Sequence, residues 1–416
     1  MGLLNRKKTA IERLKQDQQH EIVCLYCFRN FPHDRILFRA LEALDAEGYR
    51  PIIDVPLDTY RARFHMDSCG PLPVVLDPAT FNEVHKGFNR GVLSSLKDDY
   101  GNTTTKRICP YCHNDLPRSA GFARSTIISF VGASQAGKSV YLTSLIHALK
   151  TVTPRNFQIF CTPISIEMGR KFKMAYEDPL IENGCLLTPT QKEKQQEPFI
   201  FTFSFADESQ PEINIAFFDV AGEGLVDNTY MDIYAAHIRN SSGVLFLVDP
   251  LQLRSIGRKV QLLNFLDGDL QYAEDPVDVL SGLVEDFIYK QDNGVSRVPT
   301  AVVLTKTDLL EPLVNDGEYL RMGSRLFIPF SHQGYFDLTE WQALHNEVNA
   351  FIQAVDPNFG NALKRRFSDL GFFAVSALGA HPDVIRQRVS AFAPMRVEEP
   401  FLWILHRLGY IDGRSY

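Results

Sequence analysis

The segment GASQAGKSV, residues 132–140, has the residue types and spacing of a phosphate-binding loop. Gly132 and Gly137 bracket four residues, Lys138 and Ser139 follow them, and the apolar run TIISFV comes directly before the loop. Glycines let backbone N–H groups turn toward phosphate oxygens, a lysine can reach the β- and γ-phosphates, and a serine hydroxyl can bind Mg²⁺. A glycine-rich turn with an incidental lysine is the alternative. The expected strand before the loop and helix after it favour a nucleotide site.

A second motif, FFDVAGEG at residues 217–224, ends an apolar run in Asp219 and places Gly222 three residues later. An aspartate at the carboxyl end of a strand can hold Mg²⁺ through water, and a glycine N–H can approach the γ-phosphate. Taken by itself, this motif would be explained as an ordinary turn at the end of a strand. Because it follows the phosphate loop in the chain, we interpret it as part of the same site.

The third motif, LTKTDLL at residues 304–310, indicates which base is bound. The carboxylate of Asp308 can accept hydrogen bonds from the N1–H and the 2-amino group of guanine, a pair of donors that adenine lacks on that edge. Lys306 would lay its aliphatic stem along the base. The segment VSAL, residues 375–378, would supply a backbone N–H for guanine O6. The alternative is a capped helix start, since Asp and Thr are good caps.

A threonine that binds Mg²⁺ is expected between the first helix and the run FIFTFSF. The segment LLTPTQ offers Thr188 and Thr190, of which we favour Thr190, although either could be turn chemistry beside Pro189. The connection over residues 151–198 is long, and long connections in compact domains are often functional. Arg170 is a candidate arginine finger by location alone.

The predicted site therefore combines a guanine nucleotide, GTP or GDP, with Mg²⁺. The residues expected to contact the nucleotide are Gly132, Ser134, Gln135, Ala136, Gly137, Lys138, Ser139, Val140, Thr305, Lys306, Asp308, Ser376, Ala377 and Leu378. The expected Mg²⁺ ligands are Ser139, Thr190 and Asp219, and the expected catalytic residues are Lys138, Thr190, Gly222 and Glu223.

Two Cys-x-x-Cys pairs, CLYC at 24–27 and CPYC at 109–112, predict a second metal site. The thiolates of Cys24, Cys27, Cys109 and Cys112 can close a tetrahedral Zn²⁺ site. The pairs are separated by far more than the usual spacing of about 15–20 residues, so buried reduced thiols are the alternative. His113 could compete as a ligand, but an exposed neighbour of the site is the expected role. The other three cysteines, Cys69, Cys161 and Cys185, are expected to be ordinary thiols.

The elements that must position these motifs alternate along the chain from residue 122 onward. We expect strands at 126–131, 157–161, 199–205, 213–218, 243–248, 300–304 and 372–375, and helices at 138–150, 229–239, 277–290, 340–354, 381–392 and 398–409. The alternation in FIFTFSF predicts an edge strand. This order predicts an α/β fold with a mostly parallel, doubly wound sheet. Residues 1–20 are expected to form a helix, residues 21–121 a zinc-ribbon-like domain with an insertion at 28–108 and a helical pattern at 34–48, and residues 122–416 the P-loop domain.

Composition narrows the class of protein. The apolar share of 45%, the charged share of 22% and the net charge of −7 are those of a globular protein and make nucleic acid an unlikely partner. The sequence contains no run of 18 apolar residues, so it predicts no membrane span, and its N-terminus lacks the apolar core of a signal peptide. Seven cysteines without a secretion signal predict a cytoplasmic protein without disulfides.

The order GASQAGKS, DVAG, TKTD and SAL resembles the translation-factor-related class of P-loop GTPases over residues 122–416. The resemblance assigns the family roles to Gly137, Lys138, Ser139, Asp219, Gly222, Lys306, Asp308 and Ala377. Two residues depart from the commonest pattern. Thr305 replaces an asparagine that supports the phosphate loop, and Glu223 replaces a water-orienting glutamine, so slow intrinsic hydrolysis is expected.

With the zinc-ribbon pattern before it, the chain resembles the bacterial double-GTPase (DO-GTPase) group, which is linked with multi-protein conflict or defence systems. The resemblance implies a GTP-hydrolysing switch inside a larger assembly, with a protein effector or activating partner that reads the switch loops. Two alternatives stay open: a GTP-binding module that does not hydrolyse GTP and recognises partners through its zinc ribbon and insertion, and a P-loop ATPase or kinase.

Overall fold

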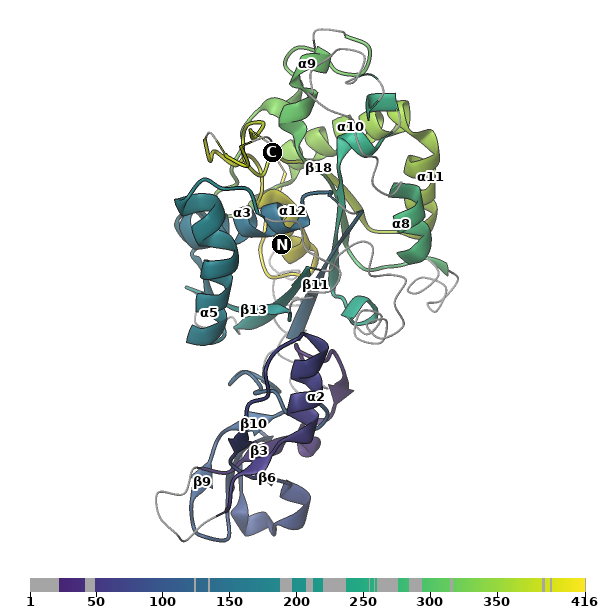
Figure 1. Cartoon of the computed structure of the whole chain (residues 1–416). Helices are drawn as coiled ribbons and strands as arrows, with labels where there is room; N and C mark the ends of the chain where they lie inside the picture. The colour runs from purple at the N-terminus through teal and green to yellow at the C-terminus, as the bar shows by residue number, and fades with distance from the viewer. Residues whose placement is uncertain are drawn as a thin grey trace, which may run out of the picture. The chain divides into compact units, whose positions relative to one another are not determined.

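The computed structural model describes residues 22–41, 49–122, 125–133, 135–187, 197–206, 212–219, 237–253, 255–257, 259, 276–283, 294–314, 317–383, 386–389 and 391–415 (Figure 1). The chain divides into two compact units, residues 1–127 with 194–216 and residues 128–193 with 217–416. Each is described by itself. The helix predicted at residues 1–20 lies outside the described residues, and the predicted domain boundaries stay a prediction.

The described residues of the first unit form very short strands and one α-helix. Strands β1 (Ile22–Val23) and β2 (Asn30–Phe31) form a hairpin, and β3 (Leu37–Arg39) pairs with both β10 (Arg107–Ile108) and β6 (Val75–Leu76). The pair β4 (Ile52–Ile53) and β5 (Pro71–Leu72) and the sheet of β7 (Lys86–Asn89), β8 (Val92–Lys97) and β9 (Thr103–Thr104) complete its strands. Helix α2 covers Val55–Arg63, and 3₁₀ turns cover His33–Arg35, Pro78–Thr80 and Glu83–His85.

The largest sheet has seven strands in the order β12-β13-β14-β11-β15-β16-β18. These are β11 (Ser125–Gly132), β12 (Ile159–Pro163), β13 (Phe199–Phe205), β14 (Ile213–Asp219), β15 (Gly243–Val248), β16 (Thr300–Leu304) and β18 (Leu370–Ala374). The helices are α3 (Lys138–Thr151), α4 (Thr153–Phe157), α5 (Ile166–Phe172) with a π-helical continuation (Lys173–Glu182), α8 (Pro276–Leu283), α9 (Glu311–Val314), α10 (Leu338–Val355), α11 (Pro357–Arg366) and α12 (Glu399–Arg407). The 3₁₀ turns Pro250–Gln252, Thr307–Leu310 and Arg325–Phe327 and the strand pair β17 (Phe336–Asp337) and β19 (Gly413–Arg414) complete the fold.

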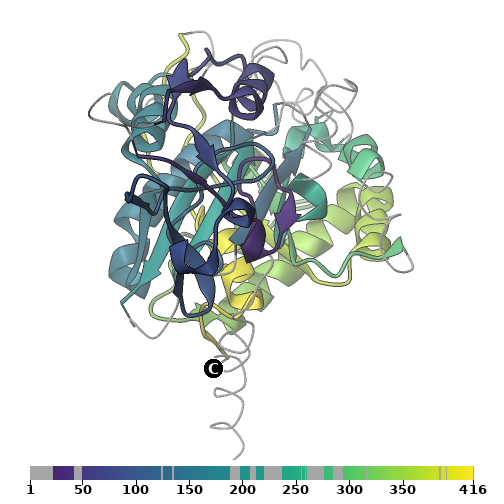
Figure 2. The same cartoon turned by 90° about the horizontal axis from the view of Figure 1, so that it is seen from below.

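Helices cover both faces of the sheet, as the predicted α/β fold requires (Figures 1 and 2). Successive residues of a strand point to opposite faces. In β18, Phe372 contacts His345 of α10, whereas its neighbour Phe373 contacts Trp403 of α12. In the internal strand β15, Phe246 contacts Phe359 of α11, whereas a Cβ on Gly243, which points to the other face, would meet Ile404 of α12. Helices α11 and α12 therefore lie on opposite faces, and the predicted doubly wound class is confirmed.

The carboxyl ends of four parallel strands meet at one edge. Gly132 at the end of β11 is level with Leu247 of β15, and Val248 at the end of β15 is level with Leu304 of β16. Leu304 is in turn level with Ala374 of β18. The loops that follow these strands must therefore start side by side, which is where ligands bind in open α/β sheets.

The prediction that FIFTFSF forms an edge strand is wrong. Strand β12 occupies the edge, with Phe160 47% exposed, and β13 is internal. The polar residue Thr202 in the middle of β13 is explained by its neighbour, because its hydroxyl donates to the Asn214 side chain at 2.8 Å. A satisfied polar side chain in an internal strand produces the same alternation as a solvent-facing one.

Two helix predictions are also wrong within the described residues. Residues 33–39 form a 3₁₀ turn and strand β3, while 42–48 lie outside the described part. Over 381–392, Asp383 and Arg388 exchange backbone hydrogen bonds of 2.8 and 2.9 Å, and Val389 donates to the Gly184 carbonyl. Tertiary pairing with a distant segment here replaces the local helical bonds that the periodic pattern predicted.

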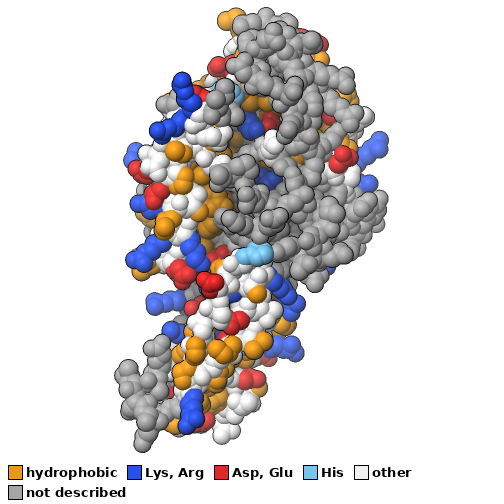
Figure 3. All heavy atoms as spheres, viewed as in Figure 1, with side chains coloured by type: hydrophobic (Ala, Val, Ile, Leu, Met, Phe, Trp, Pro, Cys, Tyr) orange, Lys and Arg blue, Asp and Glu red, His pale blue; other side chains and the backbone are white. Residues whose placement is uncertain are grey.

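The surface charge and the character of the helices are those that the composition predicts. On the face in Figure 3, Lys and Arg side chains occur at separate places with Asp and Glu among them. Within the described residues, no helix has both the length and the apolar character needed to cross a membrane.

Candidate functional site

The phosphate loop connects β11 to α3, and both of its glycines are required by geometry. A Cβ on Gly132 would lie 2.5 Å from the carbonyl oxygen of Leu247 on the neighbouring strand. Gly137 caps α3 with a φ of +81°, a backbone conformation that side chains disfavour. The Lys138 ammonium is buried inside the turn and donates to the carbonyls of Gly132 and Ala133, both at 2.9 Å.

This arrangement suits an anion. No acidic residue occupies the first turn of α3, so the positive end of the helix keeps its partial charge. Ser139 and Val140 are half-buried in that first turn. The predicted contact residue Ser134 lies outside the described residues. Lys138 and the helix N-terminus together can neutralise the phosphates of a nucleotide, and the Ser139 hydroxyl can be a Mg²⁺ ligand.

Thr305 supports the phosphate loop from β16. Its side-chain hydroxyl lies 3.0 Å from the Ala136 carbonyl oxygen and 3.2 Å from the Val248 carbonyl oxygen. A hydroxyl has one hydrogen to donate, so the two carbonyls must share it. Thr305, which replaces the asparagine of the commonest family pattern, therefore still contacts the loop. Its hydroxyl supplies one donor hydrogen, whereas an asparagine amide would supply two.

Lys306 ties three segments together. It adopts a left-handed conformation with a φ of 50°, and its ammonium donates to the Gln135 carbonyl at 2.9 Å. The same ammonium lies 2.6 Å from the carboxylate of Asp249, which is buried directly after β15. The other Asp249 oxygen caps the following turn by accepting from the Leu251 N–H at 2.9 Å.

Our sequence reasoning did not predict Asp249 as a site residue. The signal was present, because Asp249 follows a buried strand just as Asp219 does. Without the fold, however, nothing connects residue 249 to residue 306.

The predicted guanine-reading residues lie together at the ends of β16 and β18. One carboxylate oxygen of Asp308 accepts from the Ser376 hydroxyl at 2.6 Å, and that hydroxyl accepts from the Gly379 N–H at 2.9 Å. Within the described part of the chain, the other Asp308 oxygen has no hydrogen-bond donor. The Ala377 carbonyl accepts from Ser144 of α3 at 2.7 Å, which joins the guanine loop, residues 375–379, to the phosphate helix.

The predicted Mg²⁺ and catalytic residues are described only in part. Asp219 is the last residue of β14, the strand beside β11, but its side chain lies outside the described atoms. Thr188, Thr190, Gly222 and Glu223 also lie outside the described residues. Their roles stay predictions.

The four cysteines of the two Cys-x-x-Cys pairs meet in the first unit. All their sulfur atoms lie within 4.8 Å of one another and are buried, and Cys24–Cys112 and Cys27–Cys109 are 3.7 Å apart. A tetrahedral site with Zn–S bonds of about 2.3 Å requires sulfurs about 3.8 Å apart. The cluster therefore has the dimensions of a Zn²⁺ site.

Both pairs adopt the same turn. In each, the first cysteine's carbonyl accepts from the N–H four residues on, at Phe28 and at His113, and both of these residues have a positive φ near 55°. The Tyr111 N–H and the Asn114 amide approach cysteine sulfurs at 3.4 Å, a supporting contact that favours thiolates. Burial raises the pKa of the Cys24 and Cys112 thiols, whereas hydrogen bonds from the other cysteines lower the pKa of Cys27. Four thiolates this close together repel one another, so holding them here requires a cation.

His113 is not a fifth ligand in the structure. Its Nδ1 lies 2.8 Å from the carboxylate of Asp54, which also pairs with Arg39 at 2.6 Å and caps α2 through the Leu57 N–H. Burial alone would raise the Asp54 pKa, but the bonds from Arg39 and Leu57 offset it and the pKa is lowered. Asp54 thus fastens α2, part of the insertion, to the second cysteine turn.

We predict one Zn²⁺ per chain at these cysteines, measured by elemental analysis of purified protein. Cys109→Ser should abolish stoichiometric zinc and unfold the first unit, because three thiolates leave the ion incompletely held. Cys69→Ser, at an exposed thiol outside the cluster, should keep the metal. Purified protein that folds without zinc would contradict the assignment.

We also predict that Asp249→Asn weakens GDP binding about tenfold, because Lys306 loses the charged partner that holds it over the loop. Equilibrium titration with labelled GDP measures the effect. Asp369→Asn is a matched control, since that carboxylate pairs with Arg407 at 2.9 Å and lies just before β18, at the opposite end of the strand from the loops. Equal GDP affinity in parent and Asp249→Asn would show that the ion pair does not position Lys306.

Several known proteins resemble parts of this chain. The chain is 27% identical over 328 residues to SaeC, a proposed ESX-1 scaffolding and assembly protein of Mycolicibacterium smegmatis, covering 73% of this chain and 80% of SaeC. Among solved structures, the small GTPase Arl6 of Trypanosoma brucei matches 70% of this chain and 100% of its own, with 13% identity and a TM-score of 0.29. The GTPase-like domain of S. cerevisiae Ski7 matches 69% of this chain and 51% of its own, with 14% identity and a TM-score of 0.30.

The fold class rests on the sheet and its loops. The family rests on the sequence: residues 126–376, more than half of the chain, match Double-GTPase 2. This match spans the phosphate loop, the Asp219 motif and the TKTD motif. The chain belongs to the Double-GTPase 2 family of P-loop GTPases.

Proposed function

We propose that the protein is a guanine-nucleotide switch that binds GTP with Mg²⁺, hydrolyses it slowly, and signals to a protein partner. The observation that carries the proposal is the pairing of Asp308 with Ser376, at the same sheet edge as the phosphate loop. One oxygen of the carboxylate is fixed by the hydroxyl, and guanine offers two donors to the carboxylate. Adenine would leave this polar group without its partners, which is how a site rejects the wrong ligand.

The proposed switching follows from the order of the motifs. Mg²⁺ and the γ-phosphate would order the segments that carry Thr190 and Gly222, and hydrolysis would release them. Glu223, in the position of the usual water-orienting glutamine, would bring a carboxylate beside the phosphate, where like charges repel. We therefore expect slow hydrolysis by the protein alone, and a group supplied by a partner to accelerate it.

The partner is proposed to be a protein within a larger assembly. The likeness to SaeC, which is named as a scaffolding and assembly protein, supports this class of partner. More specifically, we propose that the assembly is part of a bacterial defence system. The Zn²⁺ unit, with its own insertion, would be a second recognition surface.

Base recognition is tested by Asp308→Asn. The new amide donor would face the guanine 2-amino group, so GTP affinity should fall at least a hundredfold, whereas XTP, with a carbonyl there, should bind better than GTP. Titrations with GTP, XTP and ATP at one Mg²⁺ concentration measure the preference. Lys138→Ala is the comparison variant and should weaken all three nucleotides alike. Unchanged GTP affinity, or a parent that binds ATP equally well, would favour the ATPase alternative.

Hydrolysis is tested by single-turnover measurement of γ-phosphate release from bound GTP. We expect a slow but measurable rate that rises when Glu223→Gln removes the repelling carboxylate. The nucleotide affinity of that variant should stay within a few-fold of the parent. No release from parent or variant, with tight GTP binding in both, would favour the non-hydrolysing recognition module.

A further inference from the structure

The guanine loop is paired with a segment close to the C-terminal helix. Residues 393–397, here called the strap, run beside residues 376–379. Ser376 and Met395 exchange backbone hydrogen bonds of 3.2 and 2.8 Å, and the Ala393 N–H donates to the Leu378 carbonyl at 2.8 Å. The approach is so close that a Cβ on Gly379 would lie 2.0 Å from the Ala393 carbonyl oxygen. The strap therefore fixes where the Ser376 backbone lies.

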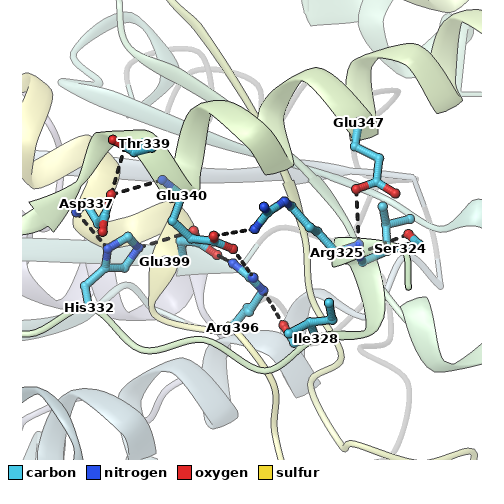
Figure 4. A network of polar contacts seen from close by, with 11 residues as sticks. Ser324, Arg325, Ile328, His332, Asp337, Thr339, Glu340, Glu347, Arg396 and Glu399 are labelled. Atoms are coloured by element: carbon cyan, nitrogen blue, oxygen red, sulfur yellow. Dashed lines mark hydrogen bonds and ion pairs between the residues drawn. The ribbon is translucent and has the colours of Figure 1, made fainter. Parts of the chain in front are cut away.

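The strap is anchored by the charged side chain of Arg396. This residue adopts a left-handed φ of 53°, and its side chain is 0% exposed. Its guanidinium donates to Glu399 at 2.9 Å, to Glu340 at 2.7 Å and to the Ile328 carbonyl at 2.8 Å (Figure 4). Three acceptors on separate elements thus hold the residue next to Met395.

The two carboxylates are themselves fixed. Glu340, in the first turn of α10, also pairs with Arg325 at 2.5 Å. Glu399, in the first turn of α12, lies 3.2 Å from His332 Nε2. Because His332 Nδ1 accepts from the Asp337 N–H at 2.9 Å, Nε2 carries the hydrogen and donates to Glu399. The cluster cannot shift without separating buried charges, which is strongly unfavourable.

The strap also contacts α3, at Val397 next to Arg396. Tyr141 of α3 donates its hydroxyl to the Val397 carbonyl at 2.9 Å. The Ser144 hydroxyl, one turn along α3, donates to Ala377 in the guanine loop. The strap and the guanine loop are therefore both tied to the helix that follows the phosphate loop.

We propose that the strap sets the position of the guanine loop, and that Arg396 is a positioning residue for guanine recognition, acting through Met395, Ser376 and Asp308. This inference rests on the proposed function. Arg396 is not one of the residues expected to contact the nucleotide. It holds the backbone of Ser376, whose hydroxyl orients the Asp308 carboxylate.

The test compares GDP with IDP, which lacks the 2-amino group of guanine. In Arg396→Lys the charge remains, but one ammonium cannot reproduce the planar fork that meets three acceptors. We expect the preference for GDP over IDP to fall about tenfold, since one charge-assisted hydrogen bond is lost. Phosphate contacts are common to both nucleotides, so the ratio reports the base alone. Glu340→Gln should lower the ratio in the same direction if Arg396→Lys does not fold.

Arg407→Lys is the matched control. Arg407 is the last residue of α12, the helix that follows the strap, and its exposed side chain pairs with Asp369 at 2.9 Å. It should keep the parent ratio. A folded Arg396→Lys or Glu340→Gln with a ratio within twofold of the parent would overturn the positioning role. A parent without preference for GDP would instead overturn the proposed guanine site.

Discussion

The loop edge of the sheet depends on the ammonium of Lys306, which binds the Gln135 carbonyl and the Asp249 carboxylate at once. Four parallel strands end at this edge, and parallel pairing alone fixes only where the loops after them start; Lys306 connects three of these loops. The Lys306 ammonium is bonded to two of the loops, and Lys306 itself belongs to the third. The three loops therefore cannot move separately. Because these loops are already ordered before a ligand binds, less conformational entropy is lost on binding.

A second cation, the guanidinium of Arg396, holds separate segments together in the same way. Arg396 lies between Glu340 and Glu399, with its side chain excluded from water. A buried ion pair contributes little net stability because desolvation costs about as much as attraction returns, but its geometry is narrowly defined. Charges in this unit are therefore better understood as setting the positions of loops than as stabilising the fold.

The first unit meets a different constraint. Its strands are mostly two to four residues long and offer little regular pairing, so the unit depends on staples. The four cysteines supply one. Asp54 supplies another, since it joins Arg39 of β3, His113 of the second cysteine turn and the start of α2. Both draw together segments that are far apart in the sequence.

The sequence alone determined the α/β class, the order of the nucleotide motifs and the cysteine cluster, because each depends on local periodicity or on a spacing that chemistry restricts. It could not determine that β12 lies at the sheet edge, that residues 381–392 pair with Gly184 and its neighbours instead of forming a helix, or that Asp249 meets Lys306. Those outcomes depend on which distant segments become neighbours. Only the tertiary structure decides this, because the free energy of such contacts does not exist until the chain has folded.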